Sequence, residues 1–177
     1  YNPTTGRTAR VVSVAAVVND TSLSAAGGDN GRDQAVAFTA SSWIHFYLVL
    51  DGATVKSRSS ATAPPTGPTL QGTESAWAYA GAVRYNATPL LVKTRMRGSF
   101  MFYETLQTAL SGGAATTETA VSLTTFIPPN AGLGLLRIVM SNTSQVAVNF
   151  TTVRVVTGVD FMYSGVAPTA LATGPLT

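Results

Sequence analysis

A chain of 177 residues without a single cysteine excludes disulfide scaffolds and zinc sites built on cysteine. Charged residues make up 11% of it, less than half the share found in average soluble domains, whereas apolar residues hold an ordinary 45%. Because solvated helices depend on Glu, Lys and Arg, this composition favours strands with Ser- and Thr-covered faces, or a surface largely covered by neighbouring subunits.

The 11 Arg and Lys residues exceed the 8 Asp and Glu residues and leave a net charge of +3. The cations are scattered except for the alternating Lys93, Arg95 and Arg97, a trio too small for the dense basic stripe of a nucleic-acid-binding protein. Nine of the 11 cations are Arg, whose planar guanidinium suits protein interfaces. No run reaches the roughly 18 apolar residues of a membrane span, so no membrane partner is expected.

In chain order, the first predicted strand covers residues 10–18 and is followed by a turn-rich loop at 24–33. Residues 42–50 (SWIHFYLVL) give the strongest strand pattern, with apolar side chains at both alternating sets of positions. We therefore expect a central strand that is covered on both faces. The Asp-Gly pair at 51–52 predicts a hairpin turn, with residues 53–56 as the returning strand.

Residues 57–73 (SRSSATAPPTGPTLQGT) form the clearest irregular segment, because its Pro and Gly residues cannot join the ladder of a central sheet. Its 17 residues exceed the usual loop length and predict a functional or contact-making loop. Further strands are expected at 76–85, 90–96, 99–104, 120–126, 133–140, 145–150 and 152–163. One helical turn is expected at 104–109, and an extended C-terminal arm at 165–177.

These elements amount to eight to ten strands without long amphipathic helices between them. Strands that follow strands in this way predict an all-β fold, an antiparallel β-sandwich or jelly roll with little helix. A chain of this length fits one such domain, so residues 1–177 are expected to form a single β-sandwich. The start at Tyr1, without an initiator Met or a signal-peptide pattern, indicates a processed product or an excised domain.

A catalytic histidine would have to be His45, because the chain has a single histidine. It lies in the middle of the strand predicted at 42–50, whereas catalytic groups concentrate in loops at strand ends. A packed structural histidine is therefore the preferred interpretation, and a Ser–His hydrolase is the alternative. Two-histidine and cysteine metal sites are excluded, and no phosphate-binding loop or dinucleotide fingerprint is present. We predict a protein that is not an enzyme and uses no cofactor or metal.

Trp77 and Tyr79 share one strand face directly after the Pro-rich segment, which makes them the best candidates for an exposed aromatic contact pair. Most aromatic residues of a strand-rich chain pack in its core, and that is the competing interpretation. An exposed pair would support the alternative function, a carbohydrate-binding or adhesin-type β-sandwich module.

Residues 91–104 (LVKTRMRGSFMFYE) resemble a piece of the capsid proteins of small non-enveloped icosahedral RNA viruses, in which an Arg-Gly pair precedes an alternating aromatic strand. The stretch 97–104 is similar in particular to the protruding domain of hepatitis E-like capsids. The excess of Ala, Thr, Ser and Val, the Pro-rich loop and the Pro/Gly tail agree with this resemblance.

The resemblance implies an antiparallel jelly roll or related barrel that packs in many copies by symmetry, and no catalytic residue of that family maps onto this chain. The capsid family usually binds RNA through a basic N-terminal arm, which this sequence lacks. Genome RNA is therefore expected as a partner only indirectly, or through a basic arm that is missing here.

The leading hypothesis is a capsid structural protein that self-assembles into an icosahedral shell, or forms its surface projection, in a virion assembled in the host cytoplasm. Its expected partners are other copies of itself or related capsid subunits, and a host receptor or glycan in addition. Arg95, Arg97 and Arg137 are the predicted interface cations. The low charge favours a shell over a projection, because lateral contacts cover much of a shell subunit.

Overall fold

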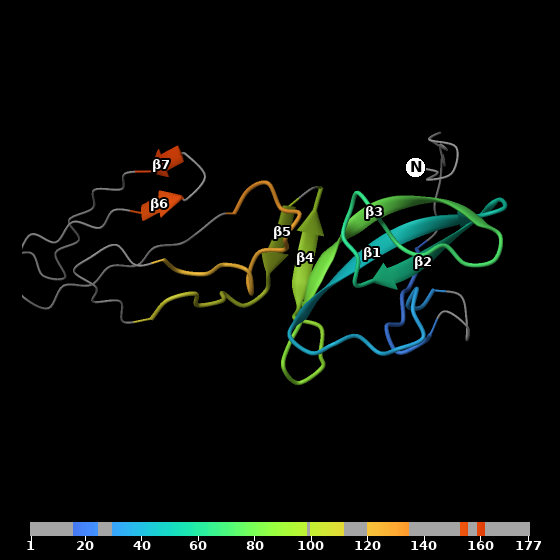
Figure 1. Ribbon diagram of the computed structural model, residues 1–177, viewed down its shortest axis with the longest axis horizontal. Helices are drawn as coiled ribbons and strands as arrows, with labels where there is room; N and C mark the ends of the chain where they lie inside the picture. Colours follow the sequence, from blue (N-terminus) through green and yellow to red (C-terminus); the bar gives the residue numbers. More distant parts are fainter. Residues whose placement is uncertain are drawn as a thin grey trace, which may run out of the picture. The chain divides into compact units, whose positions relative to one another are not determined.

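The computed structural model in Figure 1 describes residues 16–24, 30–98, 100–111 and 120–134, together with the backbone of two short strands near the C-terminus. The chain divides into two compact units, Tyr1–Gly134 and Leu135–Thr177, and each is described by itself. All regular elements of the described residues are strands, and every pair of neighbouring strands is antiparallel. The predicted all-β character is confirmed in this part of the chain.

The first unit contains a three-stranded sheet of β1 (Ser42–Asp51), β2 (Thr54–Ser60) and β3 (Glu74–Tyr85), in the order β2-β1-β3. The prediction that residues 42–50 form a central strand is confirmed. The hairpin predicted at 51–52 is also confirmed, since Asp51 pairs with Thr54 across the turn. β2 continues to Ser60, so its last residues were wrongly included in the irregular segment predicted at 57–73.

One face of this sheet forms the core of the unit. Tyr47 of β1 lies opposite Arg58 of β2 and Tyr79 of β3, and Val49 lies opposite Trp77. Tyr47 and Val49 are almost completely buried, and the Tyr47 and Trp77 rings meet edge to face with centroids 5.3 Å apart. Edge-to-face aromatic pairs add stability beyond that of their buried area.

The Pro-rich segment at 61–73 folds back over this core face. The backbone of Gly67, which has a positive φ of 77°, lies directly against the Trp77 indole, where a larger residue would overlap the ring. Leu70 packs against the aromatic cluster, and the Tyr47 hydroxyl donates a hydrogen bond of 2.7 Å to the Thr62 carbonyl. A segment predicted to make functional contacts therefore covers the protein's own core.

The opposite face of β1 is less covered than the sequence predicts. Ile44 is fully buried, but Phe46, Leu48 and Leu50 are only half-buried among the described residues. Coverage of β1 on both faces is thus confirmed at Ile44 and incomplete along the rest of the strand.

The edge of the sheet beside β2 is extended by residues 31–33. The Ser59 amide donates to the Gly31 carbonyl at 3.0 Å, and the Asp33 amide donates to the Ser59 carbonyl at 2.9 Å. The buried guanidinium of Arg32 donates to the backbone carbonyls of the preceding turn and of the segment that follows, at Thr21, Ser22 and Ala35. Three carbonyl acceptors make a buried cation tolerable here.

A second antiparallel hairpin is formed by β4 (Thr94–Arg97) and β5 (Phe100–Tyr103). β4 begins inside the strand predicted at 90–96 and extends one residue beyond it, and β5 lies inside the strand predicted at 99–104. The segment that connects β3 to β4 lies against the end of β3, because the Val92 amide donates a hydrogen bond of 2.8 Å to the Arg84 carbonyl.

The predicted strand at 120–126 and the predicted helical turn at 104–109 are both wrong, because these residues form turns and irregular structure. In the first case side chains occupy carbonyls that a strand would use in a ladder. The Trp43 indole N–H donates to the Thr124 carbonyl at 2.8 Å, and the Tyr103 hydroxyl donates to the Phe126 carbonyl at 2.7 Å.

The second unit contains the antiparallel pair β6 (Val153–Val155) and β7 (Val159–Phe161), within the strand predicted at 152–163. Residues 16–18 and 133–134 are not in strands, and the remainder of the strands predicted at 10–18 and 133–140 lies outside the described residues. The strand at 145–150 and the arm at 165–177 lie outside them as well. A single β-sandwich over 1–177 stays a prediction.

Candidate functional site

The outward face of the β4–β5 hairpin exposes two neighbouring aromatic side chains. Arg95 lies opposite Phe102 and Arg97 opposite Phe100, and residues opposite each other on paired strands share one face. Phe100 is 52% exposed and Phe102 is 43% exposed. Their ring centroids are 6.3 Å apart, so the two rings form one patch rather than two isolated contacts.

The other face of this hairpin is held against the body of the unit. The Met96 side chain lies over Gly81 of β3, where a Cβ atom would come within 2.8 Å of the Met96 methyl carbon. Tyr103 is half-buried and bonded to the Phe126 carbonyl. The hairpin therefore contacts the body of the unit through Tyr103 and through Met96, which is itself 43% exposed, and the aromatic residues of its other face are presented to solvent.

The structure brings two of the five predicted contact residues together at this surface. Arg95 and Arg97 flank the two phenylalanines, and the guanidinium of Arg95 forms an exposed ion pair of 3.0 Å with Glu104. Arg137 lies outside the described residues. Sequence reasoning named the cations but missed the phenylalanines, although the alternation of Arg at 95 and 97 and Phe at 100 and 102 was a usable signal.

The expectation that Trp77 and Tyr79 form an exposed pair is corrected by the structure. Trp77 is 9% exposed and belongs to the core cluster, and Tyr79 is half-buried against that cluster. The physical reason is the Pro-rich segment at 61–73, which covers the strand face that carries both residues.

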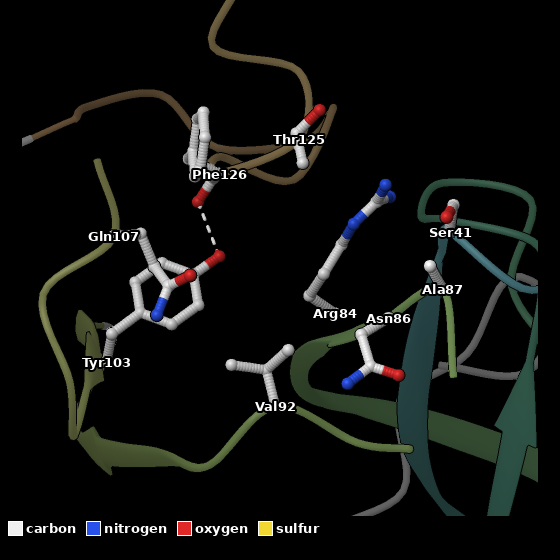
Figure 2. A pocket seen from close by; sticks show the side chains of 9 residues that line it. All are labelled: Ser41, Arg84, Asn86, Ala87, Val92, Tyr103, Gln107, Thr125 and Phe126. Carbon is white, nitrogen blue, oxygen red and sulfur yellow. Dashed lines mark hydrogen bonds between the residues drawn. The ribbon is translucent and has the colours of Figure 1, made fainter. Parts of the chain in front are cut away.

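A cavity of about 220 Å³ with both polar and apolar lining residues lies where the end of β3, the end of β5 and residues 125–126 meet. Figure 2 shows the side chain of Arg84 extending into this space from β3. The Arg84 guanidinium lies over the Trp43 ring, 5.8 Å from its centroid, which is a cation–π contact. The cavity is lined by Ser41, Arg84, Asn86, Ala87, Val92, Tyr103, Gln107, Thr125 and Phe126.

The walls of this cavity are fixed by hydrogen bonds. The Asn86 side-chain carbonyl accepts from the Leu90 amide at 2.9 Å, and its backbone carbonyl accepts from the Ser41 amide at 3.1 Å. On the far wall, the Tyr103 hydroxyl is bonded to Phe126, as the dashed line in Figure 2 marks. Burial raises the pKa of the Tyr103 hydroxyl, and the nearby charge of Arg84 acts in the opposite direction.

His45 is 1% exposed and lies on the core face of β1. Its Nδ1 atom is 3.2 Å from the Tyr79 hydroxyl, which in turn donates to the side-chain carbonyl of Asn130 at 3.4 Å. Burial lowers the pKa of His45. This geometry supports the structural interpretation of His45, and the prediction that the chain is not an enzyme stays a prediction.

Within the described ranges no cluster of three or more His, Asp or Glu residues could hold a metal ion. No helix there is long and apolar enough to cross a membrane. Comparisons of the chain with protein-family models, with curated proteins and with solved structures find no match.

Proposed function

We propose that this chain is a capsid structural protein whose copies assemble through the outward face of the β4–β5 hairpin. The observation that carries the proposal is the pair of exposed rings, Phe100 and Phe102, flanked by Arg95 and Arg97 on a hairpin whose other face is anchored. Single exposed apolar residues are normal on protein surfaces, but a cluster of neighbouring aromatic residues with Arg at its border is typical of interfaces.

The anchoring of the hairpin adds to this support. An exposed aromatic residue on a mobile loop loses conformational freedom when it binds, whereas one on an ordered strand has lost most of that freedom already. The low charge of the chain, 11% of its residues, also suits a subunit whose surface is covered by neighbours.

The finer architecture that we propose is a β-sandwich of the jelly-roll type. The antiparallel pairing of β1, β2 and β3 and the burial of one face of their sheet support it, because each sheet of a sandwich is antiparallel and buries its inner face. The virion as location, and copies of the chain or related subunits as partners, belong to the same proposal.

The test is the association state of the full chain in the variant Phe100→Ser/Phe102→Ser. Light scattering coupled to size-exclusion chromatography should show oligomers or particles for the parent chain and a shift toward monomer for the variant. The matched control is Val36→Ser/Leu133→Ser, which removes two apolar side chains that are 75% and 68% exposed outside the hairpin and should leave the association state unchanged. A parent chain that stays monomeric at high concentration would contradict the proposal.

The carbohydrate-binding alternative was tied to Trp77 and Tyr79, and these residues contribute to the core. No observation at that pair favours it.

A further inference from the structure

The cavity around Arg84 contains a cation whose charge no described residue balances. The two buried arginines of the described residues have partners: Arg32 donates to three backbone carbonyls, and Arg58 forms a buried ion pair with Glu74 at 2.7 Å. For Arg84 the structure has the Trp43 ring and no hydrogen-bond acceptor among the described residues. None of the nine residues that line the cavity is Asp or Glu. A half-buried guanidinium with unused donors is suited to an anionic ligand.

Several of the other lining residues are polar and lie on different sides of the space. The Asn86 side-chain carbonyl accepts hydrogen bonds from its own loop, which leaves its amide nitrogen as a donor. The Gln107 amide nitrogen donates to the Thr105 carbonyl, which leaves its side-chain oxygen as an acceptor. The hydroxyl-bearing side chains of Ser41 and Thr125 lie on the far side from Gln107.

The third component of the site is an apolar wall. The Tyr103 ring and the Val92 methyl groups face the cavity from one side in Figure 2, and Phe126 lies above the Tyr103 hydroxyl. A cation, scattered hydroxyl and amide groups and one apolar wall together match a ring that carries one acid, several hydroxyls and an apolar face.

We propose that this cavity binds an acidic monosaccharide, with the sugar carboxylate on Arg84, the ring hydroxyls on Asn86, Gln107 and Thr125, and an apolar ring face against Tyr103. One guanidinium balances one carboxylate, whereas a phosphate monoester of about two negative charges would stay half balanced. An aliphatic acid would leave the surrounding hydroxyl and amide groups unpaired. The volume of about 220 Å³ is below the roughly 300–1,000 Å³ of sites for drug-sized ligands, so it admits a single sugar ring.

The test is calorimetric titration of the full chain at low salt with glucuronate, with glucose, with acetate and with a short peptide that has a free C-terminus. Glucuronate should bind saturably and more tightly than the other three. Equal binding of glucose would overturn the role of Arg84, and equal binding of acetate would show a site for any small anion. Tighter binding of the peptide would assign the cavity to a chain terminus and reject the sugar.

Variants connect the binding to the proposed groups. Arg84→Gln should weaken glucuronate binding by roughly ten- to a hundredfold, in line with the loss of charge-assisted hydrogen bonds. The matched control Lys56→Gln removes the same charge from β2, at a position that does not line the cavity, and should leave the affinity within about twofold. An unchanged affinity in a folded Arg84→Gln chain contradicts the proposal.

Thr125→Val provides a second test if Arg84→Gln disturbs the fold, because Thr125 is exposed and its hydroxyl forms no hydrogen bond among the described residues. It should weaken glucuronate binding by a few-fold and leave acetate binding unchanged, since only the sugar offers a ring hydroxyl to this position. An equal loss for both ligands, or a loss for neither, would count against an acidic sugar.

Discussion

Two regions of the first unit carry alternating aromatic residues on antiparallel strands, and the structure treats them in opposite ways. On the β2-β1-β3 sheet, Tyr47 and Trp77 are buried in one cluster. On the β4–β5 hairpin, Phe100 and Phe102 are exposed to solvent. The strand patterns are similar, and the difference comes from the segment at 61–73, which folds over the first face and leaves the second free.

The ion pairs of the two regions differ in the same way. Arg58 and Glu74 meet at 2.7 Å with side chains that are 4% and 2% exposed, whereas Arg95 and Glu104 meet at 3.0 Å with 70% and 37% exposed. The pairing chemistry is identical, so the two pairs separate the effect of burial from the effect of charge. Burial is therefore decided by whether another segment of the chain covers a strand face, as residues 61–73 do here, and not by the alternating pattern of the strand itself.

The largest expected difference is between Trp77→Ala and Phe100→Ala. Loss of the buried indole should lower the free energy of unfolding by about 3–5 kcal/mol, because it removes a large apolar group and leaves a cavity. Loss of the exposed ring should change it by about 0.5 kcal/mol or less. Urea unfolding followed by far-ultraviolet circular dichroism measures both. Equal losses would show that the two regions do not differ in burial.

The second expected difference in stability is between variants that break the buried and the exposed ion pair. Glu74→Gln should lower the free energy of unfolding by about 3 kcal/mol, because it removes the buried carboxylate charge that pairs with the Arg58 guanidinium. Glu104→Gln should lower it by less than about 1 kcal/mol, as is usual for exposed pairs. The same urea unfolding experiment is the measurement. Added salt should reduce only the effect of the exposed pair, which gives an independent check.

The third expected difference in stability is between Ala variants of two glycines that have a positive φ. Gly67→Ala should cost about 2–3 kcal/mol, because the new Cβ atom adds overlap with the Trp77 indole to the backbone strain at φ 77°. Gly98→Ala has similar strain at φ 58° but open space around the Cβ position, so a cost of about 1 kcal/mol is expected. Thermal unfolding of both variants compares them. Similar losses would mean that the loop does not lie against Trp77.

Much of the sheet could be predicted because its signals are local. The apolar run at 42–50, the Asp-Gly pair after it and the aromatic run at 76–85 each specify an element within about ten residues, and all three are found. The segment at 120–126 has the composition of a strand but is held by the Trp43 indole and the Tyr103 hydroxyl. Those donors lie far away in the sequence, so composition alone could not identify its conformation.

The two candidate sites also differ in how far the sequence predicts them. The hairpin surface has a local signal, because Arg and Phe alternate within residues 95–102. The cavity has none, since Arg84 comes from β3, Tyr103 from β5 and Thr125 from a segment without regular structure. A site assembled from three separate segments becomes visible only when the chain is folded.

The smallest expected effect is the pH dependence contributed by His45 on the buried face. Burial lowers its pKa below the ordinary 6.5, so between these two values the unfolded chain binds a proton that the folded chain does not. The free energy of unfolding should therefore fall as the pH drops below about 6.5, by at most about 1.4 kcal/mol per pH unit, and this contribution should stop changing below the folded pKa. His45→Gln should remove this slope. The loss of stability at lower pH should remain, because Asp51 contributes to it: hydrogen bonds from Lys56 and Thr73 lower the pKa of its carboxyl group. Urea unfolding at a series of pH values for both chains gives the comparison, and a parent chain with no slope near pH 6 would show that His45 is open to solvent.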